Sequence, residues 1–223
     1  MLTNFRSISK YRVEALDGNV GNIHELLFDE QSWIVRYIVI NTGNLFMKNL
    51  VLLQPEEFVS CDTDEEKFLV NLTKEEIINS PSVEAVKKTN YYWPNYWVGT
   101  HLTYGWTPFN PYSKKIYTEP GINSTHEMHV YKVKAVDEQI GSVDNFIVNT
   151  EAWYISNMII NTGFSLLPGK KISVTADNVK EINNQQNFVL LDMNAQEVKN
   201  YPGYESKKSF RHIIGRPADL ITS

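Results

Sequence analysis

The sequence predicts an all-β, or mainly β, protein made of two tandem copies of one small β-barrel, each with a short C-terminal helix. Residues 11–81 recur as residues 131–202, and each copy holds short β-branched and aromatic segments separated by turn residues. The 223 residues also exceed the most common domain size of about 100–150 residues. We therefore expect two small domains and not one large domain.

The recurrence keeps one register through its first part. At an offset of 120, residues 11–43 share ten identities with residues 131–163 without a gap. The identical positions of the first copy are Tyr11, Val13, Ala15, Asp17, Gly21, Trp33 and Ile40-Asn41-Thr42-Gly43. Phe68 still matches Phe188, after which a one-residue insertion changes the offset to 121. A register of this length predicts the same fold in both copies.

A tight turn is predicted near the start of each copy. Asp17-Gly18-Asn19 separates the strand candidates 11–16 and 20–29, which is typical of a β-hairpin. The second copy has Asp137-Glu138-Gln139 and lacks the glycine, so its turn must be built differently. A turn-initiating aspartate explains the recurrence of Asp17.

Residues 33–41 predict a central strand, because they are rich in β-branched and aromatic side chains. Apolar residues occur on both faces of this strand, so both faces should be buried. Asn-Thr-Gly then turns the chain in both copies, and Gly43 and Gly163 are free to take positive φ angles there.

The remaining strands and one helix complete each copy. The other strand candidates are residues 50–54, 67–72, 170–174 and 188–192. Thr73 and Asn194 are predicted N-caps that precede acidic residues in the first helical turn, and the helices should end before Pro81 and Pro202. Five or six short strands in about 70 residues are typical of a small barrel.

Three segments of the first copy carry a family resemblance. They are Val20-Gly21 with Leu27-Phe28-Asp29, the segment 33–43, and Leu72-Thr73-Lys74-Glu75-Glu76 with Ser80-Pro81. This pattern resembles the PRC-barrel family, the small β-barrel of the H subunit of photosynthetic reaction centres. The chain is most similar to bacterial proteins with two such barrels in tandem, and the resemblance covers nearly two-thirds of it. It implies a non-enzymatic module that holds protein partners together.

The two copies differ at a candidate interaction surface. The first copy has Arg36 and Tyr37 where the second has Ser156 and Asn157. A surface role of the Arg-Tyr pair would therefore belong to the first copy alone.

Residues 84–125 are predicted to be a linker without a counterpart in either copy, and they are rich in tyrosine, tryptophan and proline. Two interpretations remain open: the rings pack between the barrels, or they form a partly exposed surface for a partner. The candidate interaction residues of the linker are Tyr91, Tyr92, Trp93, Tyr96, Trp97 and Trp106. The predicted domain boundaries are 1–83 for the first barrel, 84–125 for the linker, 126–205 for the second barrel and 206–223 for a C-terminal tail.

Composition limits the function classes. A net charge of −5 favours neither direct nucleic-acid binding nor attraction to anionic lipid. Cys61 is the single cysteine, so no intrachain disulfide or cysteine-based metal site can form. The chain has no signal-peptide pattern and no apolar run of about 18 residues. We expect a cytoplasmic protein without a membrane span.

The sequence contains no recognisable motif for catalysis or for binding a cofactor or a metal ion. His126 and His129 lack the spacing of the zinc-protease motif, and their segment enters a predicted strand. His24 is replaced by Asp144 in the second copy, which suggests a solvent-facing strand position. Residues 62–66 are acidic but lack calcium-loop spacing, so they predict a solvated turn. The neighbouring aspartates should raise the pKa of the one thiol.

The first hypothesis is therefore a non-enzymatic scaffold protein that binds an unidentified protein partner. One alternative is an RNA-processing or ribosome-associated factor, because a related barrel occurs in a ribosome-maturation factor. A second is small-molecule binding or catalysis in the cleft between the barrels, lined by linker tryptophans. Pseudo-twofold packing of the copies and a homodimer both remain open.

Overall fold

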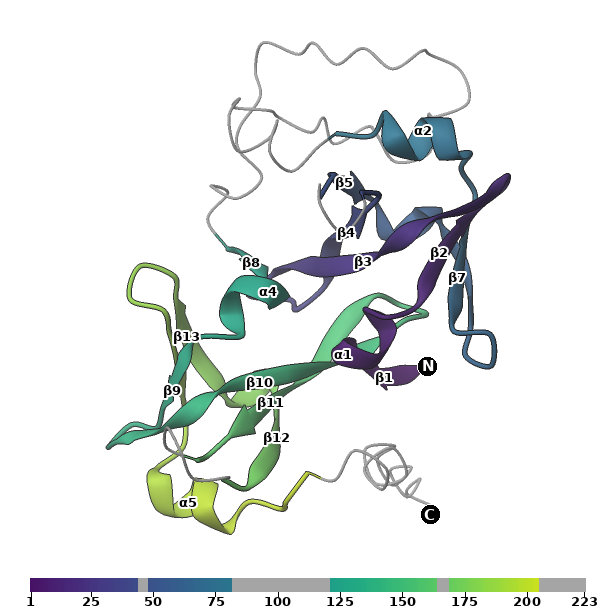
Figure 1. Ribbon diagram of the computed structural model, residues 1–223. Helices are drawn as coiled ribbons and strands as arrows, with labels where there is room; N and C mark the ends of the chain where they lie inside the picture. Colours follow the sequence, from purple (N-terminus) through teal and green to yellow (C-terminus); the bar gives the residue numbers. More distant parts are fainter. Residues whose placement is uncertain (44–47, 82–120, 164–168, 205–223) are drawn as a thin grey trace, which may run out of the picture.

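The computed structural model describes residues 1–43, 48–81, 121–163 and 169–204. These residues form two sheets of seven strands each, and the prediction of a mainly β fold is confirmed. Figure 1 shows the two sheets stacked, with the first copy in purple and blue and the second in green and yellow.

The two copies contain matching elements in the same order. The first copy consists of β1 (Leu2–Asn4), α1 (Phe5–Ile8), β2 (Arg12–Ala15), β3 (Gly18–Asp29), β4 (Val35–Asn41), β5 (Leu50–Leu53), η1 (Pro55–Glu57), β6 (Phe58–Asp62), β7 (Lys67–Val70) and α2 (Lys74–Ile78). The second consists of β8 (Ile122–Ser124), α4 (Thr125–Met128), β9 (Lys132–Lys134), β10 (Gln139–Asn149), β11 (Tyr154–Asn161), β12 (Lys171–Thr175), η3 (Ala176–Asn178), β13 (Val179–Asn183), β14 (Phe188–Leu191) and α5 (Ala195–Asn200).

Both sheets share one topology. The strand order is β5-β4-β3-β2-β7-β6 in the first sheet and β12-β11-β10-β9-β14-β13 in the second. The ladders of the described residues leave β5 and β6, and likewise β12 and β13, at the two ends of each order. They do not close either sheet into a complete barrel.

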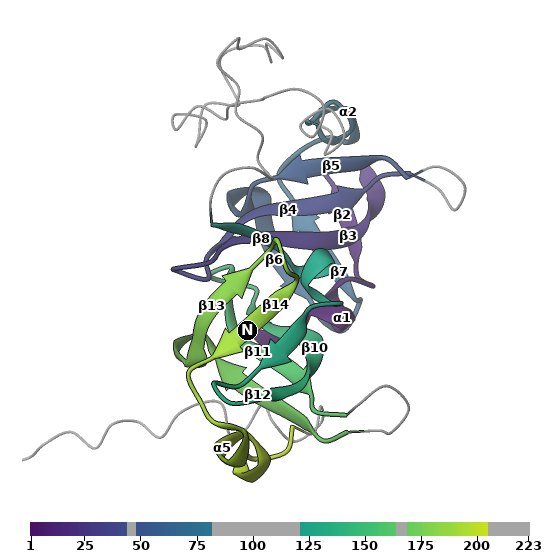
Figure 2. The same cartoon turned by 90° about the vertical axis from the view of Figure 1, so that its left-hand side faces the viewer.

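The first strand of each copy lies on the sheet of the other copy. β1 pairs antiparallel with β10, where Thr3 lies opposite Val148. β8 pairs antiparallel with β3, where Asn123 lies opposite Phe28, and Figure 2 shows β8 along β3. The helices α1 and α4 follow these strands at the junction, whereas α2 and α5 lie at opposite ends of the molecule (Figure 1). Each sheet is therefore completed by a segment of the other copy.

This exchange changes the predicted domain boundaries. Part of the predicted linker 84–125 forms β8, and the boundary predicted at residue 126 falls within α4. The structural repeat thus includes residues 2–8 and 122–128. These two segments share no identical residue at the offset of 120, which is why the recurrence is visible only from Tyr11 onward.

The ladders also correct the alignment of the copies. Phe68 lies beside Val13, and Val189 lies beside the equivalent Val133. The counterpart of Phe68 is therefore Val189, and the predicted match with Phe188 is wrong. The one-residue insertion precedes β5 and β12, so the offset is 121 from these strands onward.

A recurring glycine permits a close backbone approach in each copy. Gly21 has φ +148°, and a Cβ added there would lie 2.0 Å from the carbonyl oxygen of Asn41. Gly141 has φ +159° and the same relation to Asn161. Both the glycine and the asparagine of this contact are among the identities of the repeat.

Gly43 and Gly163 are not among the described glycines with a positive φ angle, so the freedom that the sequence allows is not used there. Their amides instead donate to the side chains of Asn41 and Asn161, at 3.1 and 3.0 Å. An asparagine turn of this kind needs no left-handed backbone. The Asn-Thr-Gly repeat is thus explained by side-chain capping of the turn.

The predicted helix caps are confirmed. The Thr73 hydroxyl accepts from the Glu76 amide, and the Glu76 carboxylate accepts from the Thr73 amide. Asn194 and Glu197 form the same capping box at the start of α5. Such boxes satisfy amides that the first helical turn leaves free.

The recurring aspartate does more than initiate a turn. Asp17 accepts from the Lys74 amide of α2 at 2.8 Å, and Asp137 accepts from the Ala195 amide of α5 at 2.9 Å. Each carboxylate lies at the positive end of a helix and connects it to the first hairpin. This contact explains why the aspartate recurs although the glycine after it does not.

Aromatic rings join the cores of the two copies. Trp153 of the second copy has its ring centroid 5.1 Å from that of Phe58 and 5.7 Å from that of Phe68, both of the first copy. Phe28 and Phe146 lie 6.0 Å apart across the same boundary. The buried apolar side chains therefore form one continuous core through both copies.

Backbone hydrogen bonds reinforce this boundary reciprocally. The Val35 amide donates to the Trp153 carbonyl at 2.8 Å, and the Ile155 amide donates to the Trp33 carbonyl at 2.9 Å. Both tryptophans have positive φ angles, 57° and 46°. They consequently lie outside the strands, and the central strand predicted from residue 33 begins at Val35.

Candidate functional site

A cavity of about 190 Å³ lies at the junction, between α1 and β10 of one side and α4 and β3 of the other. Its charged and titratable lining residues come from both copies and are Arg6, His24, His126, His129 and Asp144. At the offset of 120, Arg6 corresponds to His126, and His24 corresponds to Asp144. Two equivalent pairs of different chemistry therefore face one space.

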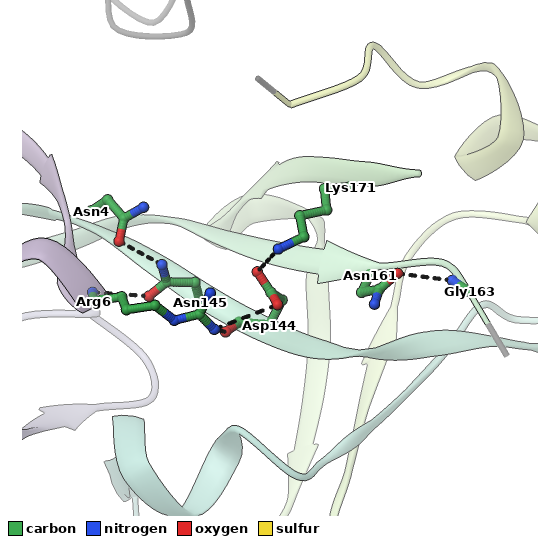
Figure 3. A network of polar contacts seen from close by, with 7 residues as sticks. All are labelled: Asn4, Arg6, Asp144, Asn145, Asn161, Gly163 and Lys171. Atoms are coloured by element: carbon green, nitrogen blue, oxygen red, sulfur yellow. Dashed lines mark hydrogen bonds and ion pairs between the residues drawn. The ribbon is translucent and has the colours of Figure 1, made fainter. Parts of the chain in front are cut away.

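The pair of Arg6 and Asp144 is ionic. The Nη2 atom of Arg6 lies 3.5 Å from Oδ1 of Asp144 and donates to its carbonyl oxygen at 3.0 Å. Nζ of Lys171 lies 2.8 Å from the other carboxylate oxygen (Figure 3). The carboxylate thus holds α1 and β12 to the same strand.

A buried asparagine fixes the same exchanged segment. Asn145 donates from Nδ2 to Oδ1 of Asn4 at 2.5 Å, and its own Oδ1 accepts from the Arg6 amide at 3.3 Å (Figure 3). The Asn145 side chain therefore bridges the end of β1 and the start of α1. Buried amides that satisfy both donor and acceptor in this way specify one register.

The pair of His24 and His126 forms no salt bridge with another residue in the described ranges. Their ring centroids lie 5.0 Å apart with the planes tilted by 38°. Burial, together with the charges of Lys48 and His126, lowers the pKa of His24 to about 4. His24 is therefore neutral at pH 7, where the equivalent position of the other copy carries a carboxylate.

These positions correct two expectations. His24 was predicted to face solvent, but it is half-buried against the helix of the other copy, and Asp144 occupies the matching position. The segment of His126 and His129 was predicted to enter a strand, but the two residues lie in and at the end of α4. Among the described residues, no three or more histidine, cysteine, aspartate or glutamate side chains are placed to hold a metal ion.

Ser124 fixes the exchanged segment on the histidine side. Its hydroxyl contacts the carboxylate of Glu25, which is 5% exposed. The same oxygen accepts from the amides of His126 and Glu127, at 3.1 Å each. The Ser124 side chain thus caps the start of α4 and also contacts a buried carboxylate.

Replacing Ser124 with alanine is expected to lower the free energy of unfolding by about 2 kcal/mol, because a helix cap and a charge-assisted hydrogen bond are lost together. Urea unfolding followed by circular dichroism measures this change. Ser60→Ala, at an exposed position on β6, is the matched control and should change stability by less than about 0.5 kcal/mol. Equal stabilities of the two variants would contradict the role given to Ser124.

The two residues of the predicted surface pair, Arg36 and Tyr37, differ in their exposure. Arg36 is exposed on β4. Tyr37 is partly buried and packs against the cluster of Leu27, Val39 and Leu52. The same cluster confirms that the central strand is buried on both faces.

The other predicted site residues lie outside the described residues. They are Tyr91, Tyr92, Trp93, Tyr96, Trp97 and Trp106. Sequence reasoning missed the residues of the junction cavity because their partners lie on exchanged segments. The signal that could have found them is the exchange of residue types at two aligned positions, Arg6 with His126 and His24 with Asp144.

A second difference between the copies lies at the tip of the hairpin between β6 and β7. At the offset of 121 the aligned tips are Asp62-Thr63-Asp64-Glu65-Glu66 and Asn183-Asn184-Gln185-Gln186-Asn187. Oδ1 of Asp62 accepts from the Glu65 amide at 3.0 Å, and Oδ1 of Asn183 accepts from the Gln186 amide at 2.9 Å. The last residue of each tip has a similar positive φ, 51° and 53°. The backbones match, but four carboxylates of one tip are amides in the other.

Apolar side chains flank the acidic tip. Val59 on β6 is 67% exposed, and Leu69 on β7 is 37% exposed. Leu69 lies beside Ser60 in the ladder. The counterpart of Val59 is Lys180, a charge of the kind that protects an edge strand from pairing. The first copy does not have this protection at the aligned position.

The thiol of Cys61 lies on β6 below this tip. Burial raises its pKa, the Met1 ammonium group opposes the shift, and Asp62 adds to it. The predicted effect of a neighbouring aspartate is present, but burial is the larger cause. A thiol with a raised pKa is a weak nucleophile at neutral pH.

No helix in the described ranges is both long enough and apolar enough to cross a bilayer. The chain matches no protein-family model, and no curated protein is significantly similar to it.

Proposed function

We propose that this chain is a non-enzymatic scaffold protein, built from two PRC-barrel-like copies, which binds a protein partner through the first copy. The observation that carries the proposal is the pair of matching hairpin tips with different charge. The resemblance of the repeat to PRC barrels supports it, because that family implies modules that hold proteins together.

The acidic side chains of the tip are not needed to build the turn. The second copy forms the same turn with amides, and its side-chain contact to the backbone has the same length within 0.1 Å. Four adjacent carboxylates also repel one another in the folded protein. Glu65 also forms an ion pair with Nζ of Lys67 at 2.6 Å. The turn itself forms equally well with amides, so a role in recognition accounts better for the acidic tip as a whole.

The surface favours a basic partner. Residues 1–81 contain 13 acidic and 7 basic residues, whereas residues 121–204 contain 9 acidic and 6 basic residues. Apolar Val59 and Leu69 beside the tip supply area that a partner could bury. Complementary charge then sets the rate and the specificity of association.

The test replaces the tip of the first copy with that of the second. The variant carries Asp62→Asn, Asp64→Gln, Glu65→Gln and Glu66→Asn, and the turn should form as before. We expect affinity capture from the native host to recover at least about tenfold less of the partner that the wild-type chain recovers. Adding salt should weaken the wild-type complex in the same direction.

A control variant removes charge from the second copy by Asp177→Asn and Asp192→Asn, both at exposed positions. This variant should capture the partner as well as the wild type does. The proposal fails if no protein is enriched by the wild-type chain, or if both variants lose the partner equally. Circular dichroism melting curves confirm that all three proteins are folded.

The junction cavity favours a second candidate function, the binding of a small molecule between the copies. The described residues that line it include histidine, arginine and asparagine side chains. The tryptophans that the sequence suggested lie outside the described residues. A ligand screen by thermal shift, repeated with His126→Ala, tests this candidate. The ribosome-associated alternative is less favoured, because the acidic excess of the first copy opposes contact with RNA phosphates.

A further inference from the structure

The two sides of the junction use equivalent positions for different chemistry. His24 of β3 meets His126 of α4 with a ring-centroid distance of 5.0 Å. On the other side, Asp144 of β10 meets Arg6 of α1 at 3.5 Å. An arginine and an aspartate attract each other, whereas two histidines repel each other once both are protonated.

We infer that the junction is pH-sensitive on one side only, so that acidification loosens β8 and α4 from the first sheet while β1 and α1 stay on the second. The inference is independent of the proposed scaffold function, because it rests on contacts within the chain. It concerns how the exchanged segments are held, and the residues of the acidic hairpin tip take no part in it.

Among the described residues, the carboxylates near the histidine pair already contact other groups. The titratable and charged groups at this part of the junction are His24 and Glu25 of β3, His126 and His129 of α4, Lys48, Arg6 of α1 and Asp144 of β10. Asp144 already contacts Arg6 and Lys171. The carboxylate of Glu25 contacts the Ser124 hydroxyl. A proton added to His24 therefore lies near the positive charges of Lys48 and Arg6.

The direction of the pH effect follows from linkage. In the closed junction, burial and the charges of Lys48 and His126 keep the pKa of His24 near 4, below its ordinary value of 6.5. When β8 and α4 detach, His24 becomes solvated and loses the nearby charge of His126, so its pKa rises toward that ordinary value, although Lys48 stays on the same copy. Between pH 6.5 and 4 the open state binds more protons, so opening becomes more favourable as the pH falls.

The expected size is modest because His24 is only half-buried. After allowance for solvent screening, the opening equilibrium constant should rise roughly tenfold between pH 7 and pH 5. The other segment is held by the attraction between Arg6 and Asp144, and no histidine takes part in that contact. The exchanged segment on that side should therefore not respond.

Hydrogen exchange of the full chain, followed by mass spectrometry, measures both segments in one experiment. After correction for intrinsic rates, amides of residues 122–128 should lose roughly tenfold of their protection between pH 7 and pH 5. Amides of residues 2–8 should keep theirs. Equal loss in both segments, or loss in neither, would overturn the inference.

The chain itself supplies a matched variant. His24→Asp with His126→Arg places the Arg6–Asp144 pair on the histidine side, and residues 122–128 should then keep their protection at pH 5. His24→Gln, which removes the titrating group alone, should also abolish the pH response and covers the case in which the double variant does not fold. His129→Gln lines the same cavity and should leave the response unchanged. A response that persists in His24→Gln contradicts the inference.

Discussion

Replacing Trp153 with alanine is expected to lower the free energy of unfolding by about 3–5 kcal/mol, the usual cost of removing a buried aromatic ring. The side chain is 5% exposed. It belongs to the second copy but packs on Phe58 and Phe68 of the first, so no residue of its own copy can close the space that it leaves. Urea unfolding followed by far-ultraviolet circular dichroism gives the change.

The control for this prediction is Val130→Ala, because Val130 is apolar but 74% exposed. It should change stability by less than about 0.5 kcal/mol. A loss below about 1 kcal/mol for Trp153→Ala would show that the ring is not part of a shared core, and the account of the boundary between the copies would be wrong.

Gly21→Ala is expected to destabilise the protein by about 3 kcal/mol or more. A Cβ at this position would overlap the carbonyl oxygen of Asn41 at 2.0 Å, and the φ of +148° is strained for any other residue. Relief requires that β3 and β4 separate where their ladder begins. Gly141→Ala should have the same effect in the second copy, because a Cβ there would meet the oxygen of Asn161 at the same distance.

Gly203→Ala is the control, because it replaces a glycine that makes no such close backbone contact. A Cβ at Gly203 would lie 3.4 Å from Cε of Lys170, the mobile end of a side chain, and the φ is not in the left-handed region. We expect a change of less than about 1 kcal/mol in thermal or urea unfolding. If Gly21→Ala were as mild as Gly203→Ala, the close approach of the two strands could not explain the recurrence of Gly21.

Local sequence signals were sufficient for much of the fold. The helix caps at Thr73 and Asn194 depend on side chains within three residues of one another, so the caps were predictable. The turn after Asp17 is equally local. The closed barrel, by contrast, depends on which distant strands meet, and the described ladders end at β5 and β6 without joining them.

The candidate site was beyond sequence reasoning for a different reason. Some of its polar groups lie on the exchanged segments, residues 2–8 and 122–128, which share no identical residue. The others lie on strand faces whose contact with a partner or with solvent depends on the tertiary structure. His24 and Asp144 occupy such positions. The presence of aspartate in one copy where the other has histidine suggested a solvent-exposed position. In the structure, each of the two side chains faces a helix of the other copy.

The sequence alone determined that the chain is mainly β, that it contains two equivalent copies, and where the C-terminal helix of each copy begins. The repeat is visible in aligned residues, and each helix cap depends on residues that are close in sequence. Only the tertiary structure decided that each copy lends its first strand to the other and that the copies share one core. Strand exchange obeys the same hydrogen-bonding rules within a copy as between copies, so no local pattern distinguishes the two. The contacts of Trp153, Asn145 and Ser124 with the other copy show that the first strands are exchanged.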